Sequence, residues 1–186
     1  MHVGQLAAFT RLCAMTTAAL LMACSSRSDS ASTSSDDYSH LMAFDSATIR
    51  IVDRDTTKVN VELAESEAQH TMGLMERRRL APDAGMLFLY SAVQPDSSAY
   101  WMYRTRIPLD IAFIDSVGVI RTILTMQPCP TIIAQGCPTY PARARFRAAL
   151  EVNAGYFAAH RIVVGNRVVL SDTTTRRRAA GRSGSD

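Results

Sequence analysis

Short strand-like segments separated by turn residues run through most of the sequence, and they constrain the fold more than any other feature. Residues 48–52 and 58–63 alternate apolar with polar side chains and are rich in β-branched residues, and turn-forming residues lie between them. This pattern predicts a β-hairpin. Five further segments have strand length and strand composition: residues 85–90, 109–114, 119–124, 148–152 and 167–170.

Two short helices are expected among these strands. Ser66 and Gln69 have the spacing of a capping box, and Gly73 suits the end of the helix that they begin. Residues 156–160 predict the second helix. Because no long amphipathic helix accompanies the strands, the sequence predicts a mainly β fold, a single compact domain with a sandwich or barrel-like form.

The two ends of the chain differ in composition from its middle. An apolar run of about a dozen residues leads into Cys24, and a tract rich in Ser and Asp follows it. The run is shorter than the roughly 20 residues that cross a membrane as a helix, and it matches the core of a signal peptide. We therefore divide the chain into a signal peptide (1–23), a flexible tether (24–43), a β domain (44–171) and a disordered Arg-rich tail (172–186).

Cys24 has the surroundings of a lipidation site. The sequence Leu21-Met22-Ala23-Cys24 resembles a bacterial lipobox, in which the cysteine is lipidated and becomes the first residue after cleavage. This predicts an exported lipoprotein that the anchor attaches to a membrane. Ser25 favours the periplasmic face of the outer membrane, by resemblance to known lipoprotein sorting. The alternative is an ordinary cleaved signal peptide with an incidental cysteine.

The charge distribution argues against a nucleic-acid partner. The formal net charge is +3, and four arginines lie in the polar tail after Asp172. Basic and acidic residues nearly balance in the β domain, whereas a nucleic-acid site needs clustered positive charge. The expected partners are the membrane, through the anchor, and an envelope protein or glycan.

Cys129 and Cys137 are the cysteines that remain once Cys13 and Cys24 are assigned to the signal peptide and the anchor. An even pair in an exported protein predicts a disulfide. A reduced pair and a catalytic or metal-binding pair remain alternatives. No metal is expected there, because zinc takes four ligands and the pair has no neighbouring histidine.

Residues 100–110 hold the densest group of candidate binding residues: Trp101, Arg104, Arg106 and Asp110. A ligand pocket combines an apolar floor with a few convergent polar groups, and these four side chains could form one. The alternative, which we favour, places Trp101 in the core. It gives Asp110 the structural role of accepting hydrogen bonds from neighbouring backbone amides.

The sequence contains no established catalytic signature, so the catalytic residues are unknown and an enzyme is less expected than a binding module. An envelope hydrolase remains the alternative, using Asp110 with a second carboxylate such as Asp115 or Glu151. No cofactor is expected. Thioethers can bind copper, but core filling is favoured for the five methionines Met72, Met75, Met86, Met102 and Met126.

Arg143, Arg145 and Arg147 alternate with smaller or apolar residues. On a strand this spacing would place all three on one face. We favour a solvated, protective edge for them. An anion-binding row is the alternative.

A series of short motifs runs in order from about Thr57 to Leu170. They are Val61-Glu62-Leu63-Ala64, Gly73-Leu74-Met75, Gly85-Met86-Leu87-Phe88, Trp101-Met102, Ile107-Pro108-Leu109-Asp110-Ile111, Phe113-Ile114-Asp115, Cys129, Cys137-Pro138, Leu150-Glu151-Val152, Ala154-Gly155 and Val164-Gly165. On these motifs the chain resembles the domain of unknown function 192 family. The resemblance implies a single mainly β domain, commonly exported, with no agreed biochemical activity. Together with the predicted anchor at Cys24, it leads us to expect an exported, lipid-anchored envelope module with a binding or accessory role.

Overall fold

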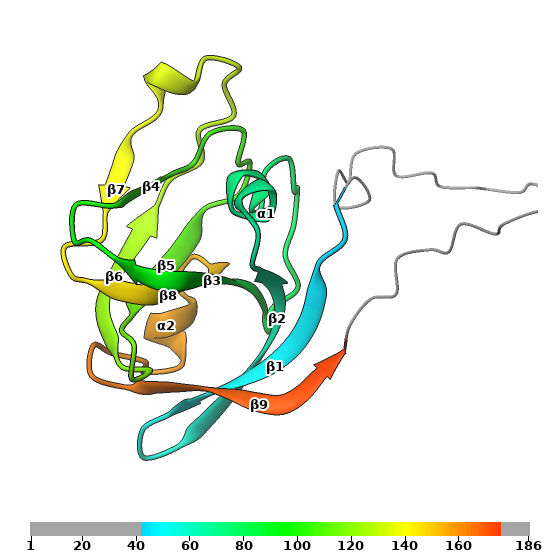
Figure 1. Ribbon diagram of the computed structural model, residues 1–186. Helices are drawn as coiled ribbons and strands as arrows, with labels where there is room; N and C mark the ends of the chain where they lie inside the picture. The colour runs from blue at the N-terminus through cyan, green and yellow to red at the C-terminus, as the bar shows by residue number, and fades with distance from the viewer. Residues whose placement is uncertain (1–41, 176–186) are drawn as a thin grey trace, which may run out of the picture. The chain divides into compact units, whose positions relative to one another are not determined.

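The computed structural model describes residues 42–175, with side chains described for residues 42–170. A curled sheet of seven strands forms a half-barrel, and a second sheet of two strands accompanies it (Figure 1). The strands are β1 (Asp45–Val52), β2 (Thr56–Ala64), β3 (Ala84–Gln94), β4 (Ala99–Trp101), β5 (Leu109–Ile114), β6 (Ile120–Met126), β7 (Thr139–Pro141), β8 (Phe146–Asn153) and β9 (Arg167–Thr175).

The large sheet has the order β6-β5-β8-β3-β2-β1-β9. Strands β2 and β3 run parallel, and the other neighbouring pairs are antiparallel. The predicted hairpin is present as β1 and β2, with Ile49 opposite Val59. The prediction of a mainly β, barrel-like domain is therefore confirmed, with a single curled sheet in place of two stacked sheets.

The two edge strands of this sheet, β6 and β9, are joined at one end by backbone hydrogen bonds, and this contact curls the sheet. The backbone N–H of Val168 donates to the carbonyl oxygen of Gly118 at 2.7 Å, and that of Ile120 donates to Asn166 at 3.0 Å. Gly118 has a φ of 85°, and a Cβ there would lie 2.7 Å from the carbonyl oxygen of Val168. A side chain at this position would therefore separate β9 from the turn before β6.

Two hydrophobic cores lie on opposite faces of the sheet. The inner core fills the curl, where helix α2 (Tyr156–Ala159) contributes Tyr156 and Phe157. The outer core lies beneath helix α1 (Glu67–Met72) and the β4–β7 pair (Figure 1). The outer core consists of Phe44, Ala64, Leu74, Met86, Phe88, Met102, Leu109, Ile111, Phe113, Met126, Ala142, Phe146 and Ala149.

Both predicted short helices are present. The Ser66 hydroxyl accepts the N–H of Gln69 at 3.3 Å, and the Gln69 side chain accepts the N–H of Ser66 at 3.0 Å, so the capping box is formed. Gly73 ends this helix with a φ of 47°. Among residues 42–175, neither helix is long and apolar enough to cross a membrane.

Several element boundaries differ from the sequence analysis. Strands β4 and β7 were not predicted, because each has only three residues. Strand β9 continues to Thr175, into the stretch that the composition assigned to the tail, because its pairing with β1 uses backbone groups rather than apolar side chains. Met42 packs against the outer core. The predicted signal peptide, Cys24, the tether up to residue 41 and the tail from residue 176 lie outside the described residues.

Candidate functional site

Trp101 lies at the surface, so the favoured prediction that it belongs to the core is wrong. Its side chain is 43% exposed. Its neighbour Tyr100 occupies the inward position instead, with edge-to-face ring contacts to Phe88 and Phe113 at 5.3 and 5.5 Å. Successive side chains on a strand point to opposite sides, so the orientation of Tyr100 sends Trp101 outward.

Trp101 has a partly buried aromatic neighbour, Tyr103, which connects it to a loop with two exposed isoleucines. Its ring centroid lies 5.4 Å from that of Tyr103, and the Tyr103 hydroxyl donates to the carbonyl oxygen of Ile132 at 3.3 Å. Ile132 and its neighbour Ile133 are 88% and 61% exposed. We call Trp101, Tyr103, Ile132 and Ile133 the aromatic face.

The loop that carries the two isoleucines is tied down at its ends. A disulfide joins Cys129 to Cys137. The N–H of Arg104 donates to the carbonyl oxygen of Cys129 at 2.9 Å, and the N–H of Cys129 donates to Thr105 at 3.1 Å. The predicted cysteine pair therefore holds the 129–137 loop against the segment that follows Trp101.

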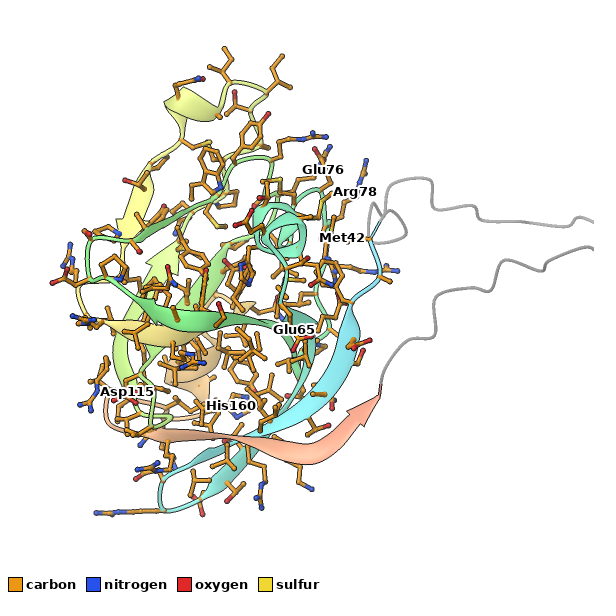
Figure 2. The ribbon with its side chains drawn as sticks, viewed as in Figure 1. Met42, Glu65, Glu76, Arg78, Asp115 and His160 are labelled. Carbon is orange, nitrogen blue, oxygen red and sulfur yellow. A yellow bond between two sulfur atoms is a disulfide. The ribbon has the colours of Figure 1, made fainter. Side chains whose placement is uncertain are left out.

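Arg104 and Arg106 both bind Glu76, which the sequence analysis missed. The Nε atoms of Arg104 and Arg106 lie 2.7 and 2.6 Å from its two carboxylate oxygens. Burial raises the pKa of Glu76, but the hydrogen bonds and charges of the two arginines outweigh burial and leave the pKa below its ordinary value. Glu76 lies near α1 (Figure 2), far in sequence from both arginines, so no local pattern indicates the cluster.

Asp110 lies away from the aromatic face, in the structural role that the sequence analysis favoured. It is 3% exposed. Its two carboxylate oxygens accept hydrogen bonds from the Thr125 hydroxyl at 2.7 Å and from the backbone N–H of Gly155 at 2.9 Å. The four candidate binding residues therefore do not form one pocket.

Glu151 is another buried acid, and it faces the opposite side of the sheet from Asp110. Its neighbours Leu150 and Val152 belong to the inner core, so Glu151 points into the outer core. It is 5% exposed and has no hydrogen bond or ion pair with the described residues. Burial raises its pKa from 4.5 to about 8. A buried acid without a partner is favoured in its neutral form.

Asp115, the other carboxylate proposed for a hydrolase, stabilises a turn. It accepts the N–H groups of Val117 and Val119 at 3.0 and 2.8 Å and pairs with Arg121 at 2.6 Å. Burial raises its pKa, but these partners leave it below the ordinary value. Hydrolysis by paired carboxylates needs two acids facing one cavity, and Asp110, Asp115 and Glu151 do not share one.

The methionines divide into two groups. Met86, Met102 and Met126 are fully buried in the outer core, as core filling predicts. Met72 and Met75 join Met42 around a hollow of about 440 Å³. Within the described part of the chain, no three His, Cys, Asp or Glu side chains are grouped to hold a metal ion.

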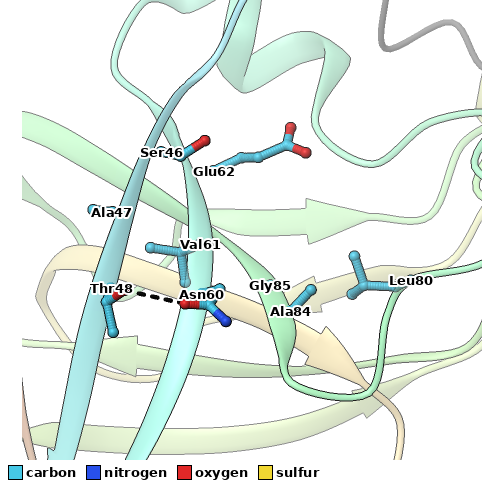
Figure 3. A pocket seen from close by; sticks show the side chains of 9 residues that line it. All are labelled: Ser46, Ala47, Thr48, Asn60, Val61, Glu62, Leu80, Ala84 and Gly85. Carbon is cyan, nitrogen blue, oxygen red and sulfur yellow. Dashed lines mark hydrogen bonds between the residues drawn. The ribbon is translucent and has the colours of Figure 1, made fainter. Parts of the chain in front are cut away.

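A shallow groove of about 380 Å³ crosses the outer surface of β1, β2 and β3 (Figure 3). A hydrogen bond of 3.1 Å joins Thr48 to Asn60 across it. Its one acidic side chain, Glu62, makes a two-point ion pair with Arg77, so the charge of the groove is already balanced.

The three alternating arginines do not share a strand face, contrary to prediction. Arg143 and Arg145 precede the start of β8 at Phe146, and Arg143 has a φ of 57°, so the chain turns there. Only Arg147 belongs to the strand. Its Nε donates to the carbonyl oxygen of Tyr90 at 2.6 Å.

Two solved structures share this fold and a related sequence. One is a protein from Sinorhizobium meliloti 1021 described as a "putative transcription regulator" (33% identity, TM-score 0.61), whose comparison covers 69% of this chain and 96% of that one. The other is a protein of unknown function from Novosphingobium aromaticivorans DSM 12444 (30% identity, TM-score 0.58), with 67% and 84% covered. A comparison with curated proteins finds no match.

The family comparison agrees with the fold and with the sequence motifs. Residues 49–170 match the model of DUF192, described as "Uncharacterized ACR, COG1430". This range contains β2 to β8 entire, the disulfide, and the buried acids Glu76, Asp110 and Glu151. The chain belongs to the DUF192 family.

Proposed function

We propose that this protein is a non-catalytic binding module of the cell envelope, anchored through lipidated Cys24, which binds a protein partner on the aromatic face. The observation that carries this proposal is the exposure of Trp101, Ile132 and Ile133, which Tyr103 links through a ring contact with Trp101 and a hydrogen bond to Ile132. Large contiguous apolar side chains at a surface are typical of interaction sites.

The composition of the aromatic face favours a protein over a glycan. Binding energy at protein interfaces is concentrated in Trp, Tyr and Arg side chains, and Arg104 and Arg106 follow Tyr103 in the chain. A sugar ring stacks on an aromatic ring and would leave Ile132 and Ile133 in water. A protein partner would cover all four side chains. The tied 129–137 loop also supports binding, because a surface that is already ordered loses less entropy on association.

The buried acids support the non-catalytic proposal over the envelope hydrolase. Asp110 and Glu151 lie on opposite faces of the sheet, and both oxygens of Asp110 accept hydrogen bonds from the protein itself. The description of the Sinorhizobium meliloti protein raises regulation of transcription as another function. The near balance of charge in the β domain favours a protein partner over DNA.

Photo-crosslinking in cells tests the partner site. A crosslinking amino acid at Ile132 is expected to yield a discrete covalent adduct with an envelope protein. The same amino acid at Val117, which is also exposed but lies in the turn before β6, should not yield it. Trp101→Ala is expected to abolish the Ile132 adduct and to change the free energy of unfolding by about 1 kcal/mol or less, because the ring is half exposed.

Two outcomes would count against the proposal. An adduct at Ile132 that persists unchanged in Trp101→Ala would show that the aromatic face does not select the partner. Binding of the purified protein to isolated cell-wall glycan, lost on Trp101→Ala, would replace the protein partner with a glycan.

The anchor is tested separately by cell fractionation. Cys24→Ser is expected to move the protein from the membrane fraction to the soluble fraction, with the loss of lipid mass. Cys13→Ser is the matched control, because Cys13 lies inside the apolar run rather than at its end, and it should remain membrane-bound. A membrane-bound Cys24→Ser protein of unchanged mass would exclude the lipoprotein assignment.

A further inference from the structure

A cleft of about 510 Å³ opens between β9 and the β3–β8 part of the sheet. Its volume lies in the range of pockets that hold small ligands, and barrel mouths are a common location for such pockets. Its apolar lining joins the inner core to the surface. The apolar lining residues are Leu87, Leu89, Ile114, Ala148, Val168 and Leu170.

The solvent exposure of the apolar lining residues increases from the inner end of the cleft to its outer end. Leu87 and Ile114 are buried members of the inner core. Leu89 and Val168 are partly buried, and Leu170 is 42% exposed at the outer end. Val168 and Leu170 are two residues apart on β9, so they present their side chains on the same face of the strand. Such a continuous apolar strip fits a linear hydrocarbon chain.

Arg147 lines the same cleft and provides its cation. Its Nε donates a hydrogen bond to the carbonyl oxygen of Tyr90. Among the residues whose side chains are described, no carboxylate forms an ion pair with its two terminal nitrogens. Asp115, the acidic residue of the lining, is already bound by Arg121 and by two backbone N–H groups. Among the residues whose side chains are described, the cleft therefore combines an apolar wall with one guanidinium group that no carboxylate pairs.

We propose that this cleft binds a free long-chain carboxylate, with the hydrocarbon chain along Leu87, Leu89 and Leu170 and the carboxylate on Arg147. A guanidinium group whose terminal nitrogens are available matches a carboxylate with two hydrogen bonds. The site is independent of the aromatic face, whose residues lie at the end of β4, just after it, and in the 129–137 loop. Figure 2 shows Asp115, a lining residue, close to β9 and far from Glu76.

Displacement of a fluorescent fatty acid tests this proposal. The protein is the full chain carrying Cys24→Ser, so that no attached acyl chain competes, and the competitors are dodecanoate and dodecanol. Arg147→Gln is expected to weaken dodecanoate binding about tenfold and to leave dodecanol binding unchanged, because only the carboxylate uses the charge. Arg145→Gln is the matched control, since Arg145 lies outside the cleft lining, and it should behave as wild type.

A second variant tests the apolar wall. Leu170→Glu is expected to weaken both dodecanoate and dodecanol, because it places a charge where the hydrocarbon chain would lie. Val164→Glu makes the same change at an exposed apolar residue outside the cleft, and it should leave both affinities unchanged. Circular dichroism of each variant confirms that the fold is retained.

Three results would overturn the proposal. The first is failure of dodecanoate to displace the probe from the folded protein. The second is an equal effect of Arg147→Gln on dodecanoate and dodecanol. The third is sedimentation of the Cys24→Ser protein with neutral phospholipid vesicles, lost on Leu170→Glu, which would make the cleft a bilayer contact. None of these results depends on Trp101 or Ile132, so the partner site and the carboxylate site can fail separately.

Discussion

Raising the pH from about 5 to about 9 is expected to lower the free energy of unfolding by roughly 4 to 5 kcal/mol, because Glu151 must lose its proton inside the outer core. Its pKa rises from 4.5 in water to about 8 in the folded protein. Each unit of difference between the two states is equivalent to about 1.4 kcal/mol. Among the described residues, no other group has its pKa displaced this far within the same pH range.

The sign of the effect follows from where the proton is bound. Between pH 4.5 and about 8 the folded state keeps the proton on Glu151, whereas the unfolded state has released it. Stability is therefore highest below pH 4.5 as far as this group is concerned, falls through that interval and levels off above it. Glu76 and Asp115 act in the opposite direction, because their lowered pKa values cost stability as the pH falls below their ordinary values.

Denaturant unfolding above about pH 5 isolates the contribution of Glu151 from that of the two paired acids. Glu151→Gln keeps the shape of the side chain and removes its proton, so its stability should vary little over this range and should exceed that of wild type at the alkaline end. Glu65→Gln makes the same change in formal charge at an exposed position and should retain the wild-type slope. A steep slope that survives in Glu151→Gln would assign the effect to another group.

Local sequence patterns predicted the strands that alternate or are long enough to be recognised, and they failed where pairing is distant. Strands β1 and β2 adjoin in sequence, so their composition and the turn between them define the hairpin. Strand β4 pairs with β7, which lies some forty residues further along the chain. Each of these strands has three residues, too few to show the alternation of apolar and polar side chains that identifies a strand. The same brevity hid the fact that Tyr100, rather than Trp101, faces the core.

The charged residues of the candidate site show the same limit. Nothing near Arg104 in sequence indicates that its partner is Glu76, because the fold alone brings the two segments together. Glu151 was more accessible to prediction. It interrupts a continuous apolar run in residues 148–152, and such runs are typical of strands buried on both faces. A lone acid in that setting indicates a buried carboxyl, although not the face toward which it points.

Asp110→Ala is expected to cost about 3 kcal/mol of stability, because it removes a buried acceptor from two donors. The backbone N–H of Gly155 would lose its partner at the start of α2, the helix that brings Tyr156 and Phe157 into the inner core. The measurement is urea unfolding of the purified variant against wild type. Asp110 therefore holds α2 to the sheet, whatever ligand the protein binds.

Asp110→Asn separates the hydrogen-bonding role of the side chain from the carboxylate charge that a hydrolase would need. Its amide oxygen can still accept the N–H of Gly155, and its NH₂ group can donate to the Thr125 hydroxyl, which is free to rotate. We expect Asn to cost about 1 kcal/mol or less, well below the cost of Ala. Thr125→Val, which removes only the exposed partner, should also cost little. If Asp110→Ala proved as stable as wild type, Asp110 would not hold α2 to the sheet. Its carboxylate would then again be a candidate catalytic group for the hydrolase alternative.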